Sequence, residues 1–246
     1  MRSEPTQRGN PNKLTIKQHV FPVASIARFA QGDGCVNVRL LANGKAERLR
    51  PGNALFYARR VWTQASEQGF MKKVEGAFQP LADRIVRSSL SVGPSDNRVI
   101  SQFYWLCRLR AEARQSPSRD VQMKGVLPGR ELTKNKEERL EKNGYIFSRG
   151  TTIPGRHMAS IRMQVRIGRL CTPELTWAVV HSTAIEFIVP DTFGEIGIIP
   201  LSPNYCLVAN VEGGEISSDN AVAMNRLAIA KASKYYFARD LTKCGV

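Results

Sequence analysis

The sequence predicts an α+β fold in which helices from the N-terminal two thirds pack against a mainly antiparallel sheet built largely from the C-terminal third. Two observations carry this prediction. Apolar residues recur at helical spacing in residues 22–30, 66–90, 95–116 and 154–170. After residue 173, short runs rich in Val, Ile and aromatic residues alternate with turn residues, which is typical of antiparallel strands.

The N-terminal part begins with a polar stretch and continues with a short helix and a hairpin. Residues 1–14 hold charged and turn-forming residues and almost nothing to bury, so we expect a flexible basic tail. Pro22 can start a helix, because proline is tolerated in the first helical turn. Asn43-Gly44 separates two short extended runs and predicts a type I′ hairpin. Residues 15–240 are expected to form one domain, and two lobes are the alternative.

Two helices and a charged excursion follow. Residues 66–90 are expected to be helical, with Pro80 kinking the helix or splitting it in two. Ser95 or Asp96 can cap the next helix, which should be a core helix. Residues 120–150 are polar, and their KNKEERLEKNG run suits an exposed helix with oppositely charged neighbours. We interpret this segment as a peripheral excursion.

The helix expected over residues 154–170 has the clearest charge pattern. Met158, Ile161 and Val165 share one face, which we expect to be apolar and inward. The opposite face carries Arg162, Arg166 and Arg169. Such a ridge could hold phosphates, although a solvated surface helix shows the same pattern.

The C-terminal third supplies the expected strands and a closing helix. The strands are predicted at residues 175–181, 185–189, 196–201 and 204–211. The cluster at residues 217–220 is an N-cap signal for an alanine-rich helix over 221–232. A short strand should follow at 235–238.

The charge of the chain points to a polyanionic partner. Lys and Arg total 36 against 21 acids, which gives a formal net charge of +15. Nucleic acid is therefore the favoured partner. The N-terminus lacks the apolar core of a signal peptide, and no apolar run approaches the roughly 20 residues of a membrane span. The five cysteines are widely spaced and are expected to be reduced, so the expected location is the cytoplasm and no membrane partner is predicted.

Three residues are candidates for catalysis and for binding a metal ion. His19 could act as a base or ligand, or could tie the chain to the first helix. Glu75 lies beside an apolar helix face and could act in catalysis or pair with a cation. Asp191 follows a predicted strand, where carboxylates often serve a site but also form turns. Gathered around Mg²⁺ or Mn²⁺, the three could activate water against a phosphodiester.

A second group of arginines lies near two aromatic residues. Arg108, Arg110 and Arg114 follow Tyr104 and Trp105 in the helix expected over 95–116. Arginines and aromatic rings together can hold single-stranded nucleic acid by phosphate contacts and stacking. The alternative is an aromatic pair in the core with solvated arginines.

Several short motifs follow one another along residues 17–240. They are an H-x-x-P opening, a D-G-x-V-x-V hairpin, P-x-N, a helix with Glu, R-x-x-P, a Trp, F-I-x-x-D, P-L-S-P and a late Asn. They are carried by His19, Pro22, Phe29, Asp33, Gly34, Val36, Val38, Pro51, Asn53, Glu75, Arg114, Pro117, Trp177, Phe187, Ile188, Asp191, Pro200, Leu201, Ser202, Pro203 and Asn225. This ordered set resembles the bacterial domain-of-unknown-function family 4238. The resemblance implies no particular activity and associates the chain with mobile or defence-related bacterial contexts.

Two classes of function therefore compete. The first is a nucleic-acid-targeting bacterial effector, such as a metal-dependent nuclease or toxin in a defence or mobile-element context. The second is a non-catalytic RNA- or DNA-binding module of a larger complex, or an adaptor whose positive face meets an acidic partner protein. The basic charge favours a nucleic-acid target in either class, whereas the spacing of the candidate residues does not show that they converge.

Overall fold

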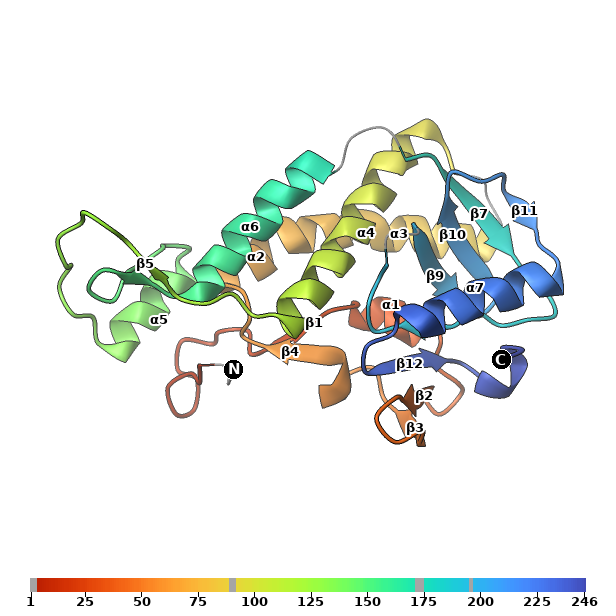
Figure 1. Cartoon of the computed structure of the whole chain (residues 1–246), viewed down its shortest axis with the longest axis horizontal. Helices are drawn as coiled ribbons and strands as arrows, with labels where there is room; N and C mark the ends of the chain where they lie inside the picture. The colour runs from red at the N-terminus through yellow and green to blue at the C-terminus, as the bar shows by residue number, and fades with distance from the viewer. Residues whose placement is uncertain (1–3, 89–91, 171–174, 195–196) are drawn as a thin grey trace.

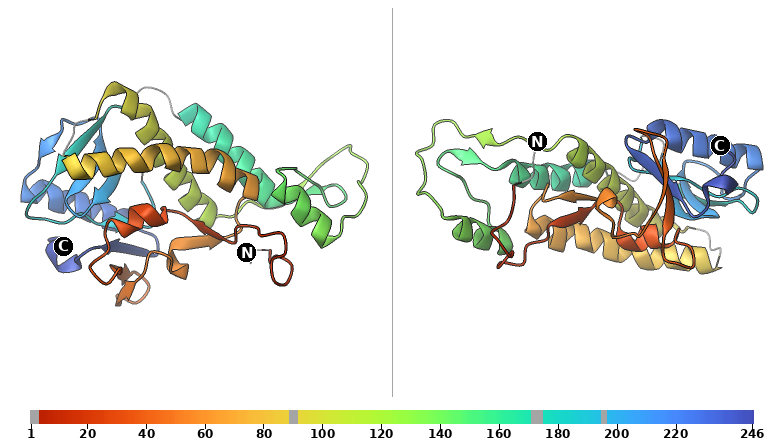
Figure 2. Two further views of the ribbon diagram at one scale, coloured as in Figure 1. Left: turned by 180° about the vertical axis from the view of Figure 1, so that it is seen from behind. Right: turned by 90° about the horizontal axis from the view of Figure 1, so that it is seen from below.

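The computed structural model describes residues 4–88, 92–170, 175–194 and 197–246, and its architecture is α+β as predicted (Figure 1). The molecule is elongated. Two four-stranded sheets and the last helix lie at one end, and a helical excursion lies at the other (Figures 1 and 2). Long helices in the middle connect the two ends.

The longer helices follow the predicted order. They are α1 (Val23–Ala27), α3 (Lys72–Ser88), α4 (Pro94–Gln115), α5 (Lys134–Lys142), α6 (Gly155–Leu170) and α7 (Ser218–Lys231). A short turn, α2 (Gln64–Ser66), and a π-helical turn (Glu67–Met71) precede α3. The break lies at Gly69, whose φ of −94° and ψ of −110° are not helical, and α3 continues through Pro80. The predicted split at Pro80 is therefore wrong.

The strands form two four-stranded sheets and two small pairs. The first sheet has the order β11-β7-β10-β9, from Gly214–Glu215, Trp177–His181, Tyr205–Ala209 and Ile198–Ser202. The second has the order β3-β2-β12-β8, from Ala46–Leu49, Val36–Leu40, Tyr235–Ala238 and Val189–Pro190. The pairs are β1 (Lys17–His19) with β4 (Tyr57–Arg59) and β5 (Val121–Gln122) with β6 (Thr152–Ile153).

The second sheet joins the two ends of the chain. The predicted hairpin, β2 with β3, forms, but its turn is not the predicted type I′, because Gly44 has a positive φ of +66° and Asn43 does not. β2 also pairs antiparallel with β12. Val36 and Val38 of β2 are fully buried, and a lone two-stranded hairpin could not bury them. The sheet structure is thus less confined to the C-terminal third than predicted.

Local capping signals set the ends of two helices. The Asp96 carboxylate accepts a hydrogen bond from the Gly93 backbone N–H at 3.1 Å at the start of α4. The Ser217 hydroxyl accepts one from the Asn220 N–H at the start of α7. Ser217 caps α7 as predicted, whereas the N-cap of α4 is Gly93 and Asp96 lies at the third position of its first turn. α4 ends before Ser116, as predicted.

The N-terminal segment is bound to the excursion. The backbone N–H of Gln7 donates to Glu138 Oε1 at 2.7 Å, the Asn12 side chain donates to Glu138 Oε2 at 3.0 Å, and Leu14 is buried. Residues 4–14 thus lie along α5, where the sequence led us to expect a loose tail. The excursion is peripheral as expected, but the acidic face of α5 is buried, contrary to the prediction of an exposed helix.

Two further expectations concern membranes and cysteines. Within the described ranges no helix is both long enough and apolar enough to cross a bilayer. Cys35, Cys107, Cys206 and Cys244 are free thiols. Cys171 lies outside the described residues.

Candidate functional site

The structure does not gather the three residues that were predicted to hold a metal ion. Asp191 follows β8, and its Oδ1 accepts hydrogen bonds from the backbone N–H groups of Ser233 at 2.7 Å and Lys234 at 3.2 Å. It therefore fixes the turn between α7 and β12. Among the described residues, which include His19 and Glu75, no group of three or more His, Cys, Asp and Glu could hold a metal ion. The predicted shared metal site is wrong.

His19 and Glu75 instead lie near one buried guanidinium, that of Arg110. Arg110 is 1% exposed, and its Nη1 lies 2.5 Å from Glu75 Oε1 while its Nη2 lies 3.6 Å from Glu67 Oε2. Burial lowers the pKa of His19, and the charge of Arg110 lowers it further. Glu75 is therefore the counter-ion of Arg110. The assignment of Arg110 as a nucleic-acid contact is wrong, because its side chain is enclosed by the core.

Arg108 and Arg166 share one acidic partner. Arg108 packs over the Trp105 ring at 5.0 Å and lies 3.5 Å from Glu112. Arg166 Nη1 lies 2.5 Å from the same Glu112 carboxylate. The Glu112 carboxylate thus partly neutralises one arginine of α4 and one of α6. Arg108 and Arg166 therefore contribute less to the positive potential of the surface than the sequence suggested.

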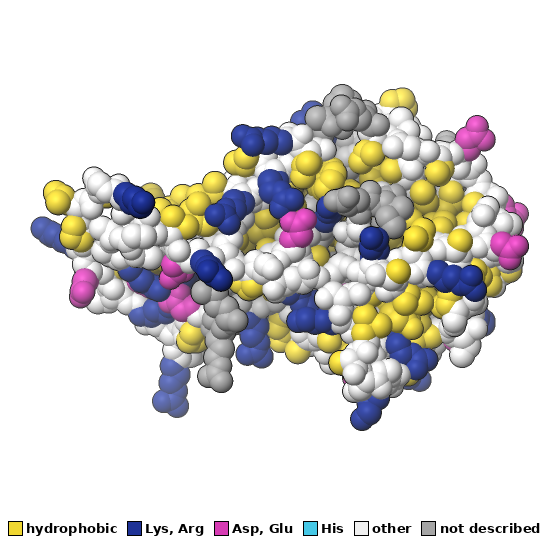
Figure 3. Space-filling model, viewed as in Figure 1, with side chains coloured by type: hydrophobic (Ala, Val, Ile, Leu, Met, Phe, Trp, Pro, Cys, Tyr) yellow, Lys and Arg dark blue, Asp and Glu magenta, His cyan; other side chains and the backbone are white. Residues whose placement is uncertain are grey.

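α6 buries a different face from the one predicted. Ile161 and Val165 are 38% and 46% exposed. The residues that pack on α4 and its neighbours are Ala159, Met163 and Ile167. Both sets recur at helical spacing, so periodicity alone could not separate them. Arg162 and Arg169 lie on the exposed side, and Figure 3 shows Lys and Arg spread along this side of the molecule without forming one continuous stripe.

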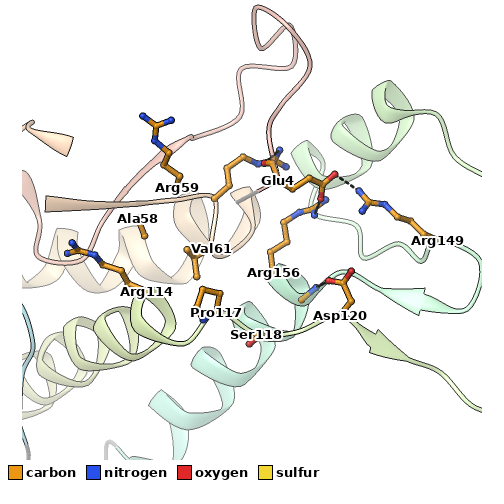
Figure 4. Close-up of a pocket in the computed structure, with 12 residues that line it drawn as sticks. Glu4, Ala58, Arg59, Val61, Arg114, Pro117, Ser118, Asp120, Arg149 and Arg156 are labelled. Carbon is orange, nitrogen blue, oxygen red and sulfur yellow. Dashed lines mark hydrogen bonds and ion pairs between the residues drawn. The ribbon is translucent and has the colours of Figure 1, made fainter. Parts of the chain in front are cut away.

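Positive charge is concentrated in a cleft of about 460 Å³ that opens beside β4, the segment after α4 and the start of α6 (Figure 4). Its charged lining residues are Arg59, Arg60, Arg114, Arg149, Arg156, Glu4 and Asp120. Arg59 and Arg114 lie at one end of the cleft, and Glu4, Arg149 and Arg156 lie at the other. Arg114 is the only arginine predicted from sequence that lines it, and it also packs over the Tyr235 ring at 5.6 Å.

Backbone geometry places two neighbouring arginines on different sides of the chain. Arg60 has a φ of +46°, and its N–H donates to the Ile16 carbonyl at 3.2 Å. This left-handed conformation is uncommon for a non-glycine residue. It leaves Arg59 exposed at the rim while the Arg60 side chain is only 2% exposed.

The opposite wall of the cleft forms where the start of α6 lies close against the backbone of the segment after α4. A Cβ atom on Gly155 would lie 1.9 Å from the carbonyl oxygen of Ser118, so only glycine fits at this position. The Gly155 N–H donates to Asp120 Oδ1 at 2.8 Å. The first turn of α6 is thereby held against the segment that follows α4, and this contact positions Arg156 in the cleft.

A buried ion network supports the arginines. Glu141 Oε2 accepts from Arg60 Nη2 at 2.7 Å and from Arg156 Nε at 2.8 Å, and these side chains are 2%, 2% and 6% exposed. Arg149 makes a two-pronged contact with Glu137, at 2.6 Å for each pair. Arg60 Nε and Arg156 Nη2 are buried and have no hydrogen-bond partner within the described part of the chain. Two donors beside the cleft are therefore unsatisfied, and both are buried in this structure.

Sequence reasoning missed most of this site. It did not single out Glu4, Arg59, Arg60, Arg149 or Arg156. The available signal was the spacing of Glu137 and Glu141, which places two acids on one face of α5 and would require cationic partners if that face were buried. The partner Arg60 lies 81 residues away from Glu141, so no local pattern identifies it.

No protein family, no curated protein and no solved structure matches the chain. The resemblance to family 4238 therefore stays a prediction, as do the bacterial contexts that it implies.

His157 should make stability depend on pH. It is 2% exposed, its ring packs edge-on against Phe147 at 4.8 Å, and its Nε2 has no partner among described residues. Burial and then the charge of Arg156 lower its pKa to about 4, although Glu141 opposes the shift. In the unfolded chain its pKa is about 6.5. As pH falls from 6.5 to 4, the unfolded state gains a proton that the folded state does not.

We expect this proton uptake to lower the free energy of unfolding by up to roughly 3 kcal/mol between pH 7 and pH 4. Urea unfolding of the wild type and of His157→Gln at both pH values measures it. Other groups also titrate in this range, so the relevant quantity is the difference between the two proteins. Equal losses of stability in both would contradict the assignment.

Proposed function

We propose that the protein binds nucleic acid by its phosphate groups in the arginine-lined cleft. The observation that carries the proposal is the convergence of five arginine side chains on one cleft of about 460 Å³. The planar fork of a guanidinium matches phosphate oxygens, and Arg59 and Arg114 present theirs at one end of the cleft. The net charge of +15 supports the proposal, because it attracts a polyanion from a distance.

Of the two classes considered, the non-catalytic RNA- or DNA-binding module has the better support. A nuclease built on His19, Glu75 and Asp191 is not proposed, because Asp191 caps backbone N–H groups and Glu75 neutralises Arg110. A role in a bacterial defence or mobile-element complex is part of the proposal only through the resemblance to family 4238.

Replacing Arg59 and Arg114 with glutamine tests the cleft. Both line it, and neither is ion-paired with an acid of the described chain, so folding should tolerate the change. Each phosphate contact contributes about −0.7 to −0.9 to the slope of log K against log salt. The double variant should therefore bind more weakly, with a slope shallower by about 1.5. Fluorescence anisotropy with single-stranded and duplex RNA and DNA of about 20 nucleotides, from 50 to 200 mM salt, measures both quantities.

The controls separate the cleft from general charge. Arg226→Gln removes an exposed arginine on α7, outside the cleft, and should leave affinity nearly unchanged. The Arg162→Gln, Arg169→Gln double variant tests the exposed side of α6. If it alone lost binding, the interface would be α6 and the cleft assignment would fail. Absence of wild-type binding at 50 mM salt would refute the proposal, and cleavage products with Mg²⁺ or Mn²⁺ would favour the effector class.

A further inference from the structure

The cleft already contains an anion that belongs to the chain itself, the carboxylate of Glu4. Its Oε2 lies 2.6 Å from Arg156 Nη1, and its Oε1 accepts from Arg149 Nη2 and Lys134 Nζ. The Glu4 backbone carbonyl accepts from Arg60 Nη1 at 3.4 Å. Figure 4 shows the Glu4 carboxylate at the end of the cleft where Arg149 and Arg156 meet. One small anionic group is thus held by three cations, as a phosphate would be.

The carboxylate is fully charged at neutral pH. Partial burial alone would raise its pKa, but the hydrogen bonds from Lys134 and Arg149 and the charge of Arg156 lower the pKa of Glu4 to about 2. The attachment of the segment to α5 through Gln7 and Asn12 does not depend on Glu4. The side chain can therefore leave the cations while the rest of the segment stays in place.

The balance of charge indicates which ligand could replace Glu4. The cations that line the cleft or contact Glu4 are Arg59, Arg60, Arg114, Lys134, Arg149 and Arg156. Asp120 lines the cleft, Glu137 and Glu141 pair with these cations, and Glu138 interacts electrostatically with Arg60, so four acids other than Glu4 belong to the cluster. Two positive charges remain once Glu4 is removed. A terminal phosphate carries about −1.5 to −2 at pH 7, whereas an internal phosphodiester carries one negative charge.

We propose that the end of the cleft formed by Lys134, Arg149 and Arg156 is a subsite for a terminal phosphate of a nucleic acid, and that Glu4 occupies it as a tethered competitor. This inference rests on the proposed function and adds the chemical class of the strand end to it. A strand that ends in a phosphate displaces Glu4 and takes over its contacts with Lys134, Arg149 and Arg156. A strand that ends in a hydroxyl leaves Glu4 in place and binds only through the rest of the cleft.

Glu4→Gln removes the competing charge and keeps the size of the side chain. Because a tethered competitor reduces the fraction of molecules whose subsite is open, its removal should raise the affinity for phosphorylated strands by roughly three- to tenfold. Affinity for a hydroxyl-ended strand should change by less than about twofold, because that strand does not compete with Glu4. The matched control is Glu131→Gln, which removes an exposed acid of the excursion and the same charge.

The experiment measures binding of the full chain to one RNA sequence of 20 nucleotides with a 5′-phosphate, a 3′-phosphate or hydroxyls at both ends. The wild type should prefer one phosphorylated form, Glu4→Gln should enlarge that preference, and Lys134→Gln should remove it. Inorganic phosphate should compete for the phosphorylated strand. Thermal unfolding of each variant shows that it is folded.

Three results of this experiment would contradict the subsite, the proposed function or both. Equal affinity for all three strands, or a Glu4→Gln variant that binds the phosphorylated strands no better than Glu131→Gln does, would overturn the subsite and make Glu4 a structural tie. Salt-dependent binding in the cleft would then still support the proposed function. If the wild type bound none of the strands, both proposals would fall.

Discussion

Replacing Glu141 with glutamine is expected to lower the free energy of unfolding by about 3–5 kcal/mol. The wild-type carboxylate accepts from two guanidiniums, those of Arg60 and Arg156, and all three side chains are at least nine-tenths buried. Glutamine has nearly the same shape but no charge, so it leaves buried Arg60 without an ion-paired carboxylate among the described residues and Arg156 with Glu4 alone. Burying an unpaired charge is among the most costly changes that a single substitution can make.

Urea unfolding of Glu141→Gln beside Glu131→Gln checks this expectation. The control removes the same charge from an exposed position and should change stability by no more than about 0.5 kcal/mol. A triple variant, with Glu141→Leu, Arg60→Met and Arg156→Met, replaces the whole group with apolar side chains and should regain much of the loss. If Glu141→Gln were as stable as Glu131→Gln, the ion pairs of Glu141 with Arg60 and Arg156 would not stabilise the cleft.

The triple variant also separates stability from binding. It lacks two of the five cleft arginines, so a folded triple variant should bind nucleic acid poorly. A chain that only needed a stable connection at this point could use apolar residues there, since a buried ion pair is often no more stable than its apolar replacement. The buried charges at this point therefore support the proposed phosphate ligand.

The parts of the fold that were predicted correctly depend on neighbours in sequence. Asn43-Gly44 lies in the turn of the β2–β3 hairpin, Ser217 caps α7, and Asp96 accepts a backbone hydrogen bond in the first turn of α4. Turns and caps involve residues within four positions of one another, so a single sequence shows them. The α+β class follows from the same local signals.

The site was poorly predicted because it is tertiary in origin. Glu4, Arg60, Arg114, Arg149 and Arg156 come from separate segments, and only the folded chain brings them together. Charge content predicted that some cations would meet phosphates, but it could not say which cations are already neutralised by acids. Periodicity likewise allowed two apolar faces on α6, and only the packing against α4 shows which of them is buried.

Replacing Glu75 with glutamine should lower the stability of the fold and leave nucleic-acid affinity unchanged. Arg110 is 1% exposed, and Glu75 at 2.5 Å is its nearest counter-ion, with Glu67 at 3.6 Å as the second. Loss of Glu75 leaves a buried guanidinium with one weak partner, so we expect a loss of about 3–4 kcal/mol.

Adding Arg110→Met to Glu75→Gln should recover part of that stability, because the cation that needed the acid is then gone. Urea unfolding of the two single variants and the double variant measures the coupling between them. Nucleic-acid affinity at a temperature where each variant is folded should equal that of the wild type, because neither residue lines the cleft. A Glu75→Gln protein of wild-type stability that had lost binding would instead return Glu75 to the functional site and would remove the structural role assigned to its pairing with Arg110.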